Sequence, residues 1–350
     1  MSTVDISKVQ DYAEKHKKEL LNLAVMNAEV IQKMDLVAGV TDKYTMTELA
    51  FKKIFKPYAK AWDPDSNKAE LIPRTGRVEI GQVELEEEPL RYLKTYLGNI
   101  LKGGVNPEEH PFEKEFLEGI VKRVSNDIND DLAFFGDYAL RQSQDPAIAK
   151  SVKSINNGFF TIIDKEVAAN NISEAKGNLI KTGDINSTNA VAKLKSFYRK
   201  ACTKMPALRS QTVRLYISFE VYDAYNDNYQ AINGALPYNK EFEKTFLEGS
   251  ANRCILEPMS SMGISKRIML GPFENFKVLV DQISDQEDIT VFNPGNPKVM
   301  GFFLAAAIGF EFMTLNALWT NEAEVDGDAS GSPSASASAS ASASPSGSPS

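Results

Sequence analysis

The sequence predicts an α+β fold, and three observations carry that prediction. Apolar residues recur every four positions through 112–132, a period that indicates one long helix. The segment 300–319 is apolar on both faces, as in a buried strand. Between 155 and 281, strand and helix patterns follow each other without the regular alternation of a doubly wound sheet.

Residues 1–60 are predicted to form a helical arm. Apolar positions in 6–34 recur with a helical period and leave a polar face, and Gly39 and Thr41 interrupt the pattern. A second short helix is expected over 47–58, ending near Pro57. These helices would lie on the surface of their own subunit or pack on a neighbouring subunit, and the sequence favours neither.

The segment 61–91 is divided by prolines and glycines and has an alternating pattern. Ile80, Val83 and Leu85 alternate with polar residues, and the alternation is interrupted at Gly81. This pattern predicts a long two-stranded hairpin with polar faces. Few large apolar side chains are available to attach it to a core. We therefore expect it to project and to offer its strand edges to another chain.

The long helix is the clearest element of the sequence. Asn106, followed by Pro107 and two glutamates, is a suitable N-terminus, although the helix could also begin at Pro111. The stripe comprises Phe112, Phe116, Ile120, Val124, Ile128 and Leu132. It is sustained over about six turns and ends at the Phe134-Phe135-Gly136 run. Aromatic residues at this spacing are expected in a core rather than around a cofactor.

The central segment mixes both element types. We expect strands over 158–164, 212–218, 254–258, 268–270 and 276–281, and helices over 187–205 and 219–232. Ser218 is the expected N-cap of the second helix.

The segment 300–319 is the most hydrophobic of the chain, and a buried strand, a buried helix and a membrane span are its alternatives. Its length suits a span, but Glu311 lies inside it and the acidic run 321–326 follows. We interpret it as a buried strand in which Glu311 reaches the surface or an ion pair.

Composition and charge narrow the function classes. The chain has 350 residues and a formal net charge of −8, which disfavours sequence-specific binding of nucleic acid. Its two cysteines are far apart and predict no disulfide framework, so a reducing compartment fits. The N-terminus lacks the layout of a secretion signal. We therefore expect a cytoplasmic site of synthesis.

The last 22 residues contain 11 serines, 6 alanines, 3 prolines and 2 glycines. This composition cannot bury enough apolar surface to offset chain entropy, so we predict a disordered tail over 329–350. A solubilising role, a glycosylation target and a segment for partners are its alternatives.

The sequence carries no recognisable catalytic motif. His16 and His110 have no evident partners, and no nucleotide, zinc-protease or hydrolase signature is present. Asp63 and Asp65 lack the remaining positions of a calcium loop. The acidic run 84–88 is better explained as a solvated strand edge or as the partner of a basic patch than as a cation site. We therefore expect a structural protein, with no catalytic residue, cofactor or metal.

The order of these parts resembles that of the major capsid proteins of tailed bacteriophages, with the Hong Kong 97-type fold. The resemblance covers most of 40–324 and rests on the hairpin segment, the long helix and the chain ending 315–324. It also rests on the run Glu257-Pro258-Met259, followed by Ile268 and by Gly271 to Asn275. None of these motifs is as specific as a catalytic signature.

The resemblance implies a division of the chain. Residues 61–91 would be the extended loop across the neighbouring subunit. Residues 92–147 and 288–328 would form the peripheral domain with the spine helix, and 148–287 the axial domain. The subunits would assemble as hexamers and pentamers into an icosahedral head around double-stranded DNA, in the cytoplasm of a bacterial host.

The resemblance also implies partners. About 60 residues precede the loop, too few for a fused scaffolding segment, so a separate scaffold protein or a short retained arm is expected. Portal and head-decoration proteins, non-specific contact with packaged DNA and no membrane contact are implied. We expect the intersubunit ion pairs to involve Arg74, Arg77, Glu84, Glu86, Glu87 and Glu88.

Three rival functions stay open from the sequence. An encapsulin-like nanocompartment shell shares the fold. A carboxylate-dependent α+β hydrolase and a secreted adhesin with a serine-rich stalk belong to other classes.

Overall fold

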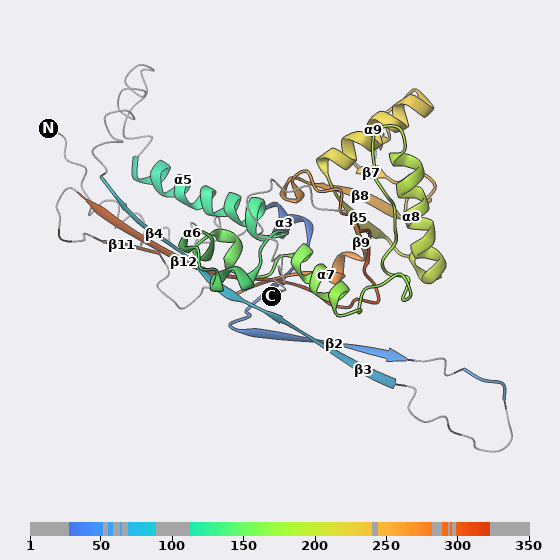
Figure 1. Ribbon diagram of the computed structural model, residues 1–350, viewed down its shortest axis with the longest axis horizontal. Helices are drawn as coiled ribbons and strands as arrows, with labels where there is room; N and C mark the ends of the chain where they lie inside the picture. Colours follow the sequence, from blue (N-terminus) through green and yellow to red (C-terminus); the bar gives the residue numbers. More distant parts are fainter. Residues whose placement is uncertain are drawn as a thin grey trace, which may run out of the picture.

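The computed structural model confirms the α+β class (Figure 1). The structure describes residues 28–51, 55–58, 64, 69–88, 112–239, 244–281, 289–292, 295 and 299–322. The predicted tail, most of the N-terminal arm and the Asn106 cap lie outside these residues.

The first sheet is built around one long strand. Its strands are β1 (Asp35–Ala38), β10 (Phe276–Val280), β12 (Met300–Phe312), β11 (Ile289–Phe292) and β4 (Glu79–Glu87). Strands β10 and β11 pair antiparallel with opposite ends of β12, and β4 pairs along its other edge. The predicted strand in 300–319 is thus confirmed. Among the described residues, no helix has the length and apolar character that a membrane crossing requires.

Helices cover one face of this sheet. The predicted spine helix is α5 (Phe112–Asp127), continued by a π-helical turn over Ile128–Leu132. The even-numbered side chains of β12 face α5 and α7 (Phe159–Ala168) in one core. The centroid of the Phe159 ring lies 5.4 Å from that of the Phe310 ring and 5.2 Å from that of the Phe312 ring. Short helix α6 (Pro146–Ala149) lies nearby.

A second sheet forms a separate core. Its strand order is β13 (Trp319–Thr320), β9 (Met269–Gly271), β5 (Val213–Ser218), β8 (Cys254–Met259), β7 (Lys244–Phe246) and β6 (Tyr238–Asn239). Helices α8 (Ala190–Lys204) and α9 (Phe219–Asn233) pack on it. These positions confirm the strands and helices predicted from residue 187 to 281. Ser218 caps α9 as expected, because its hydroxyl accepts a hydrogen bond from the Val221 N–H.

The short helix α3 (Glu29–Lys33) connects the two cores. Its apolar side chains are buried in the first core. The carboxylate of Glu29 accepts hydrogen bonds from the backbone N–H groups of Ser260 (2.8 Å) and Ser261 (3.3 Å), directly after β8. The Tyr216 hydroxyl donates to the Lys33 carbonyl at 3.0 Å. The chain before the first sheet is therefore anchored to the second.

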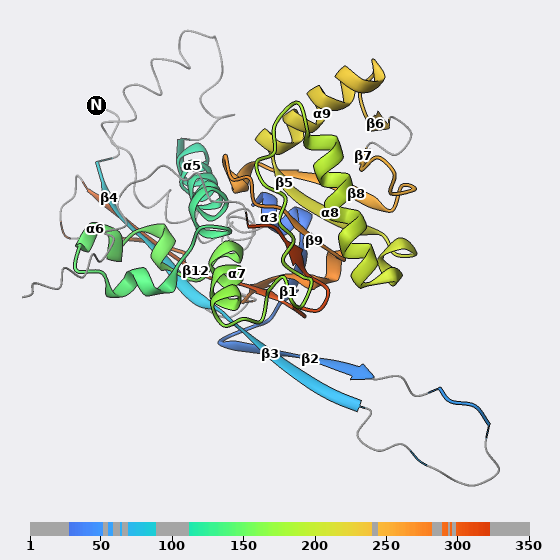
Figure 2. The same cartoon turned by 45° about the vertical axis from the view of Figure 1, so that its right-hand side comes forward.

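A two-stranded ribbon leaves the body of the subunit (Figures 1 and 2). Its strands, β2 (Lys43–Phe51) and β3 (Ala69–Arg77), pair antiparallel over their whole length. A single residue, Val78, separates β3 from β4. One nearly continuous strand thus begins at the outer end of the ribbon and ends in the first sheet.

Two predicted elements were wrong in type. The segment 47–58, predicted as a helix, begins in β2: Met46 is buried between exposed neighbours, as the period of a strand requires. The predicted strand 158–164 is the start of α7. Phe159, Phe160, Ile162 and Ile163 are all buried, which is the spacing of a helix face rather than of a strand. The apolar, β-branched run was too short to separate the two periods.

The hairpin predicted within 61–91 is also wrong in its pairing. β3 pairs with β2, and β4 pairs with β12, so the two halves of the segment do not pair with each other. Gly81 is not a turn: it lies opposite Ala306, where an added Cβ would come 3.0 Å from Ile155 Cδ1. The glycine allows close packing on the helical layer, which a sequence pattern cannot distinguish from a turn.

The segments that form the two cores do not coincide with the predicted domains. Strand β10 and helix α7 belong to the first core although they lie within 148–287. Strand β13 belongs to the second sheet although it lies within 288–328. The assignment of peripheral and axial domains stays a prediction.

Candidate intersubunit surface

The ribbon exposes apolar side chains that have no cover within the described subunit. Leu49 and Leu71 are paired directly across β2 and β3, and they are 51% and 66% exposed. Tyr44 and Ile72 are also partly exposed. An isolated two-stranded hairpin is marginally stable in water. A projecting ribbon with this surface is therefore suited to bind another chain.

The ribbon crosses the first sheet at two glycines. A Cβ on Gly76 of β3 would lie 2.5 Å from Leu279 Cδ1 and 3.0 Å from Glu311 Cβ. A Cβ on Gly309 of β12 would lie 2.2 Å from the Arg77 carbonyl oxygen. The absence of both side chains lets β3 lie directly on the outer face of the sheet. The base of the ribbon is thereby fixed by packing as well as by pairing.

Arg74 fixes the same crossing by charge. Its Nη2 lies 2.7 Å from Glu311 Oε1 on β12, and its Nη1 lies 2.8 Å from Glu166 Oε1 on α7. The Arg74 side chain is only 16% exposed. Burial raises the pKa of Glu311, an effect that Arg74 and the Phe312 N–H oppose without cancelling. Of the two alternatives for Glu311, the surface and an ion pair, the structure shows the ion pair.

Arg74 therefore has partners inside its own subunit, whereas Arg77 is largely free. The Arg77 side chain is 55% exposed and lies 3.9 Å from Asp42 and 3.8 Å from Glu79, at the limit of an ion pair. The intersubunit contacts predicted for both arginines stay a prediction.

The predicted acidic residues lie at the far end of β4, away from both arginines. Glu84 and Glu86 are exposed and pair in register with Phe303 and Gly301 of β12. Glu87 lies opposite Met300, and Glu88 follows the strand. The structure thus brings Glu84 and Glu86 together on one face but separates them from Arg74 and Arg77 within the subunit.

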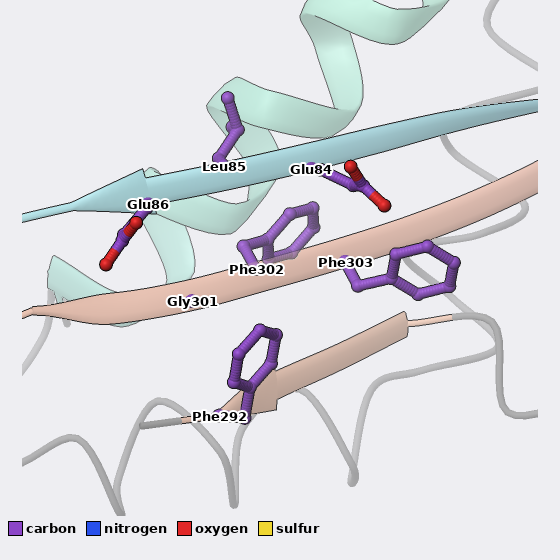
Figure 3. A pocket seen from close by; sticks show the side chains of 7 residues that line it. All are labelled: Glu84, Leu85, Glu86, Phe292, Gly301, Phe302 and Phe303. Atoms are coloured by element: carbon purple, nitrogen blue, oxygen red, sulfur yellow. The ribbon is translucent and has the colours of Figure 1, made fainter. Parts of the chain in front are cut away.

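Glu84 and Glu86 line an open hollow of about 440 Å³. Phe292 of β11 and Phe303 of β12 line it together with them, beside Gly301 (Figure 3). Sequence analysis missed Gly301 and both phenylalanines, because only the pairing of β11 with β12 places them beside the acidic strand.

Signs of catalytic chemistry are weak in the described part of the chain. It holds no group of three or more histidines, cysteines or acids that could bind a metal. Cys202 and Cys254 are buried free thiols, and burial raises the pKa of Cys254, which makes it a poor nucleophile. His16, His110, Asp63 and Asp65 lie outside the described residues.

No family model matches the sequence, and no curated protein does. The structure is similar to solved structures that are mostly phage capsids. The procapsid of satellite phage P4 matches with a TM-score of 0.48 and 9% identity, over 87% of this chain and 90% of that one. Mycobacterium phage Cain gives 0.47 and 14%, over 83% and 89%.

An encapsulin is similar to the same degree. The SrpI encapsulin of Synechococcus elongatus matches with a TM-score of 0.46 and 10% identity, over 83% of this chain and 85% of that one.

Proposed function

We propose that this chain is the major capsid protein of a tailed bacteriophage, with a Hong Kong 97-type fold. Its copies would assemble as hexamers and pentamers into an icosahedral head that encloses double-stranded DNA. The observation that carries the proposal is the ribbon β2–β3, which projects from the subunit with Leu49 and Leu71 exposed and opposed.

The ribbon supports self-association for a physical reason. Removing its exposed apolar side chains from water is favourable. An isolated pair of strands is only marginally stable in water, so contact with a further surface would stabilise the ribbon. Its base, in contrast, is held firmly by Arg74 and by the crossing at Gly76 and Gly309. Because its base is rigid, the ribbon would lose little conformational entropy on binding. In a symmetric closed shell the same contact would be repeated by every subunit.

The proposal assigns a structural rather than an enzymatic role. It includes a virion location, assembly in the host cytoplasm, and a separate scaffold protein. The order of the described elements supports it: the ribbon precedes the spine helix α5, most of the second core follows, and the long strand β12 comes near the end of the described chain.

The test is electron microscopy of the purified recombinant protein, with particle mass from light scattering. We expect closed shells, or rings of five and six subunits. DNA in particles made with the neighbouring phage genes would support a virus, whereas a protein cargo would support the encapsulin alternative. A strictly monomeric or dimeric protein at high concentration, with those genes co-expressed, would contradict the proposal.

A further inference from the structure

A second open hollow, of about 410 Å³, lies at the C-terminal end of helix α8. The residues that shape it are Glu174, Gly177, Lys181, Lys200, Thr203 and Lys204. Gly177 has a φ of +76°, which favours glycine, and a Cβ there would lie 3.1 Å from Lys204 Cδ. The lysine stem therefore lies over the glycine. Because three of its side chains are lysines, we call this surface the basic hollow.

The described residues do not neutralise all the lysines of the basic hollow. Lys181 forms an ion pair with Glu174 and lies 3.6 Å from a carboxylate oxygen of Glu322. Lys200 and Lys204 are exposed, and neither ammonium group has an ion pair or a hydrogen bond with another described residue. Two positive charges without a described partner thus lie side by side on a chain with a net charge of −8. The basic hollow therefore attracts an anionic group.

The last described residues of the chain lie at the edge of the basic hollow. The N–H of Thr320 donates to the Asn178 carbonyl at 3.0 Å, and its own carbonyl accepts from the Ile180 N–H at 2.9 Å. This pairing places the chain beside the segment that precedes α8. Glu322, two residues further on, meets Lys181. The next residues of the sequence therefore start from a fixed point beside the lysines.

The sequence that follows Glu322 has the complementary charge. Residues 323–328 are Ala-Glu-Val-Asp-Gly-Asp, with three acids and no basic residue, whereas 329–350 contain no charged side chain. The acids beyond Glu322 therefore all lie within six positions of it. At about 3.3 Å per residue, six extended residues span roughly 20 Å, which is enough to cross a hollow of this size.

The spacing of the two sets of charges also matches. Lys200 and Lys204 are four residues apart on α8, which is about 6 Å along the helix axis. In an extended segment alternate side chains point to the same side and lie about 6.6 Å apart. Glu324, Asp326 and Asp328 are such alternate residues. Two neighbouring acids of this set can therefore face the two lysines at the same time.

We infer that the acidic segment 323–328 binds in the basic hollow of its own subunit, through Lys200 and Lys204. The short connection to Glu322 favours this segment over a free anion, because a tethered group has a high effective concentration. Binding would fix the place, beside the end of α8, from which the serine-rich segment 329–350 leaves each subunit. The inference concerns a single subunit and does not depend on the proposed assembly.

A protease that cleaves after glutamate tests the inference on dissociated subunits at low salt. Cleavage after Glu322 or Glu324 releases the serine-rich segment, and mass spectrometry follows its release with time. Because exposed ion pairs are individually weak, we expect release from K200Q/K204Q to be about threefold to tenfold faster than from the wild type. Equal rates in these two proteins would overturn the inference.

The matched control is K122Q/K150Q, which makes the same change in net charge at α5 and directly after α6. We expect it to release the segment at the wild-type rate. A rate raised equally in both variants would assign the effect to the net charge of the protein and would also overturn the inference.

Cross-linking identifies the contact directly. A carbodiimide joins a carboxylate to a lysine only when the two are in contact. In dissociated wild-type subunits we expect Lys200 or Lys204 linked to an acid of 323–328, and loss of these links at about 1 M salt. A mixture of isotope-labelled and unlabelled subunits distinguishes links within one chain from links between two copies. Links found only between copies, or none between these two segments, would overturn the inference.

Discussion

At the scale of single residues, Arg74 connects three elements, because its guanidinium bridges carboxylates from β12 and α7 while its backbone belongs to the ribbon. Removing one partner of a buried ion pair leaves the other charge unpaired. In Arg74→Ala two such carboxylates would remain, Glu166 and Glu311. We expect a loss of about 3 kcal/mol in the free energy of unfolding, measured by urea denaturation of the dissociated subunit.

Arg77→Ala is the matched control. This arginine lies on the same strand, is mostly exposed and has only distant partners, so its loss should cost less than about 1 kcal/mol. Equal losses in the two variants would refute the role assigned to Arg74. Reversal of Arg74 to Glu is therefore unsuitable as an assembly test, because it would damage the subunit itself.

The carboxylate of Glu29 should make the free energy of unfolding depend on pH, and the direction of its pKa shift fixes the sign of that dependence. Burial alone would raise its pKa, but hydrogen bonds from Ser260 and Lys33 outweigh this effect and lower the pKa below its ordinary value of 4.5. A carboxylate whose pKa is lowered by folding stabilises the protein above pH 4.5, and this contribution is lost as the pH falls through the lowered pKa. Glu29→Gln should therefore be less stable than the wild type at neutral pH, and the difference should shrink below pH 4.5.

Glu311 provides the contrasting case in the same denaturation series. Its pKa is raised by folding, so protonation favours the folded state, and its contribution to stability grows as the pH falls toward 4.5. Relative to Glu311→Gln, the wild type should gain stability over that interval. The same sign of change in both variants would contradict the assigned pKa directions.

At the scale of elements, the crossing of the ribbon over β12 depends on Gly309. The Cβ of an alanine there would lie 2.2 Å from the Arg77 carbonyl oxygen, a backbone atom that cannot rotate away. Gly309→Ala should therefore cost about 1–3 kcal/mol, as over-packed cores do. Thermal denaturation of the dissociated subunit measures this loss as a lower midpoint.

Gly119→Ala is the control, and its expected sign is opposite. Gly119 lies inside helix α5, and a Cβ there would meet nothing within 4 Å. Alanine should stabilise this helix by roughly 0.5–1 kcal/mol. If both substitutions lowered the midpoint equally, the close approach at Gly309 would not be the cause.

Most helices and strands could be predicted from the sequence, but Gly81 and the α7 segment could not be interpreted correctly from local pattern alone. The spine helix, α8, α9 and the strands β5, β8 and β9 were predictable, because each presents an apolar run of the right period or a cap such as Ser218. Gly81 was misinterpreted as a turn, because its partner Ala306 lies more than 200 residues away in the sequence. The α7 segment was misassigned because its apolar run satisfies both periods.

The candidate surface was predictable only in part for the same reason. The acidic run and the projection of Ala69–Arg77 follow from local sequence, whereas the pairing of Glu79–Glu87 within the first sheet does not. The aromatic half of the hollow does not, because Phe292 and Phe303 meet Glu84 only through pairing between distant strands. Arg74 was expected at an interface between subunits, yet its partners Glu166 and Glu311 lie within its own subunit.

At the scale of the whole molecule, we expect the exposed ribbon to contribute more to the stability of the assembly than to that of the isolated subunit. Leu49 and Leu71 contribute little to the isolated subunit, because they are exposed. If a neighbouring copy covers them, their burial should contribute about 2–3 kcal/mol per subunit, given that roughly half of each side chain is already covered. L49S/L71S should then lose little subunit stability but assemble only at about 30- to 150-fold higher concentration.

I232S/L236S is the control for this last prediction. It removes a similar pair of apolar side chains, each 62% exposed, one in the last turn of α9 and one three residues beyond that helix. Light scattering against protein concentration gives the assembly threshold for each variant, and urea denaturation gives the subunit stability. A threshold raised by the ribbon variant alone would assign the apolar contact to the ribbon. Equal thresholds for the two variants, or a loss of subunit stability in L49S/L71S, would mean that the ribbon leucines serve the fold or the general solubility of the protein rather than its assembly.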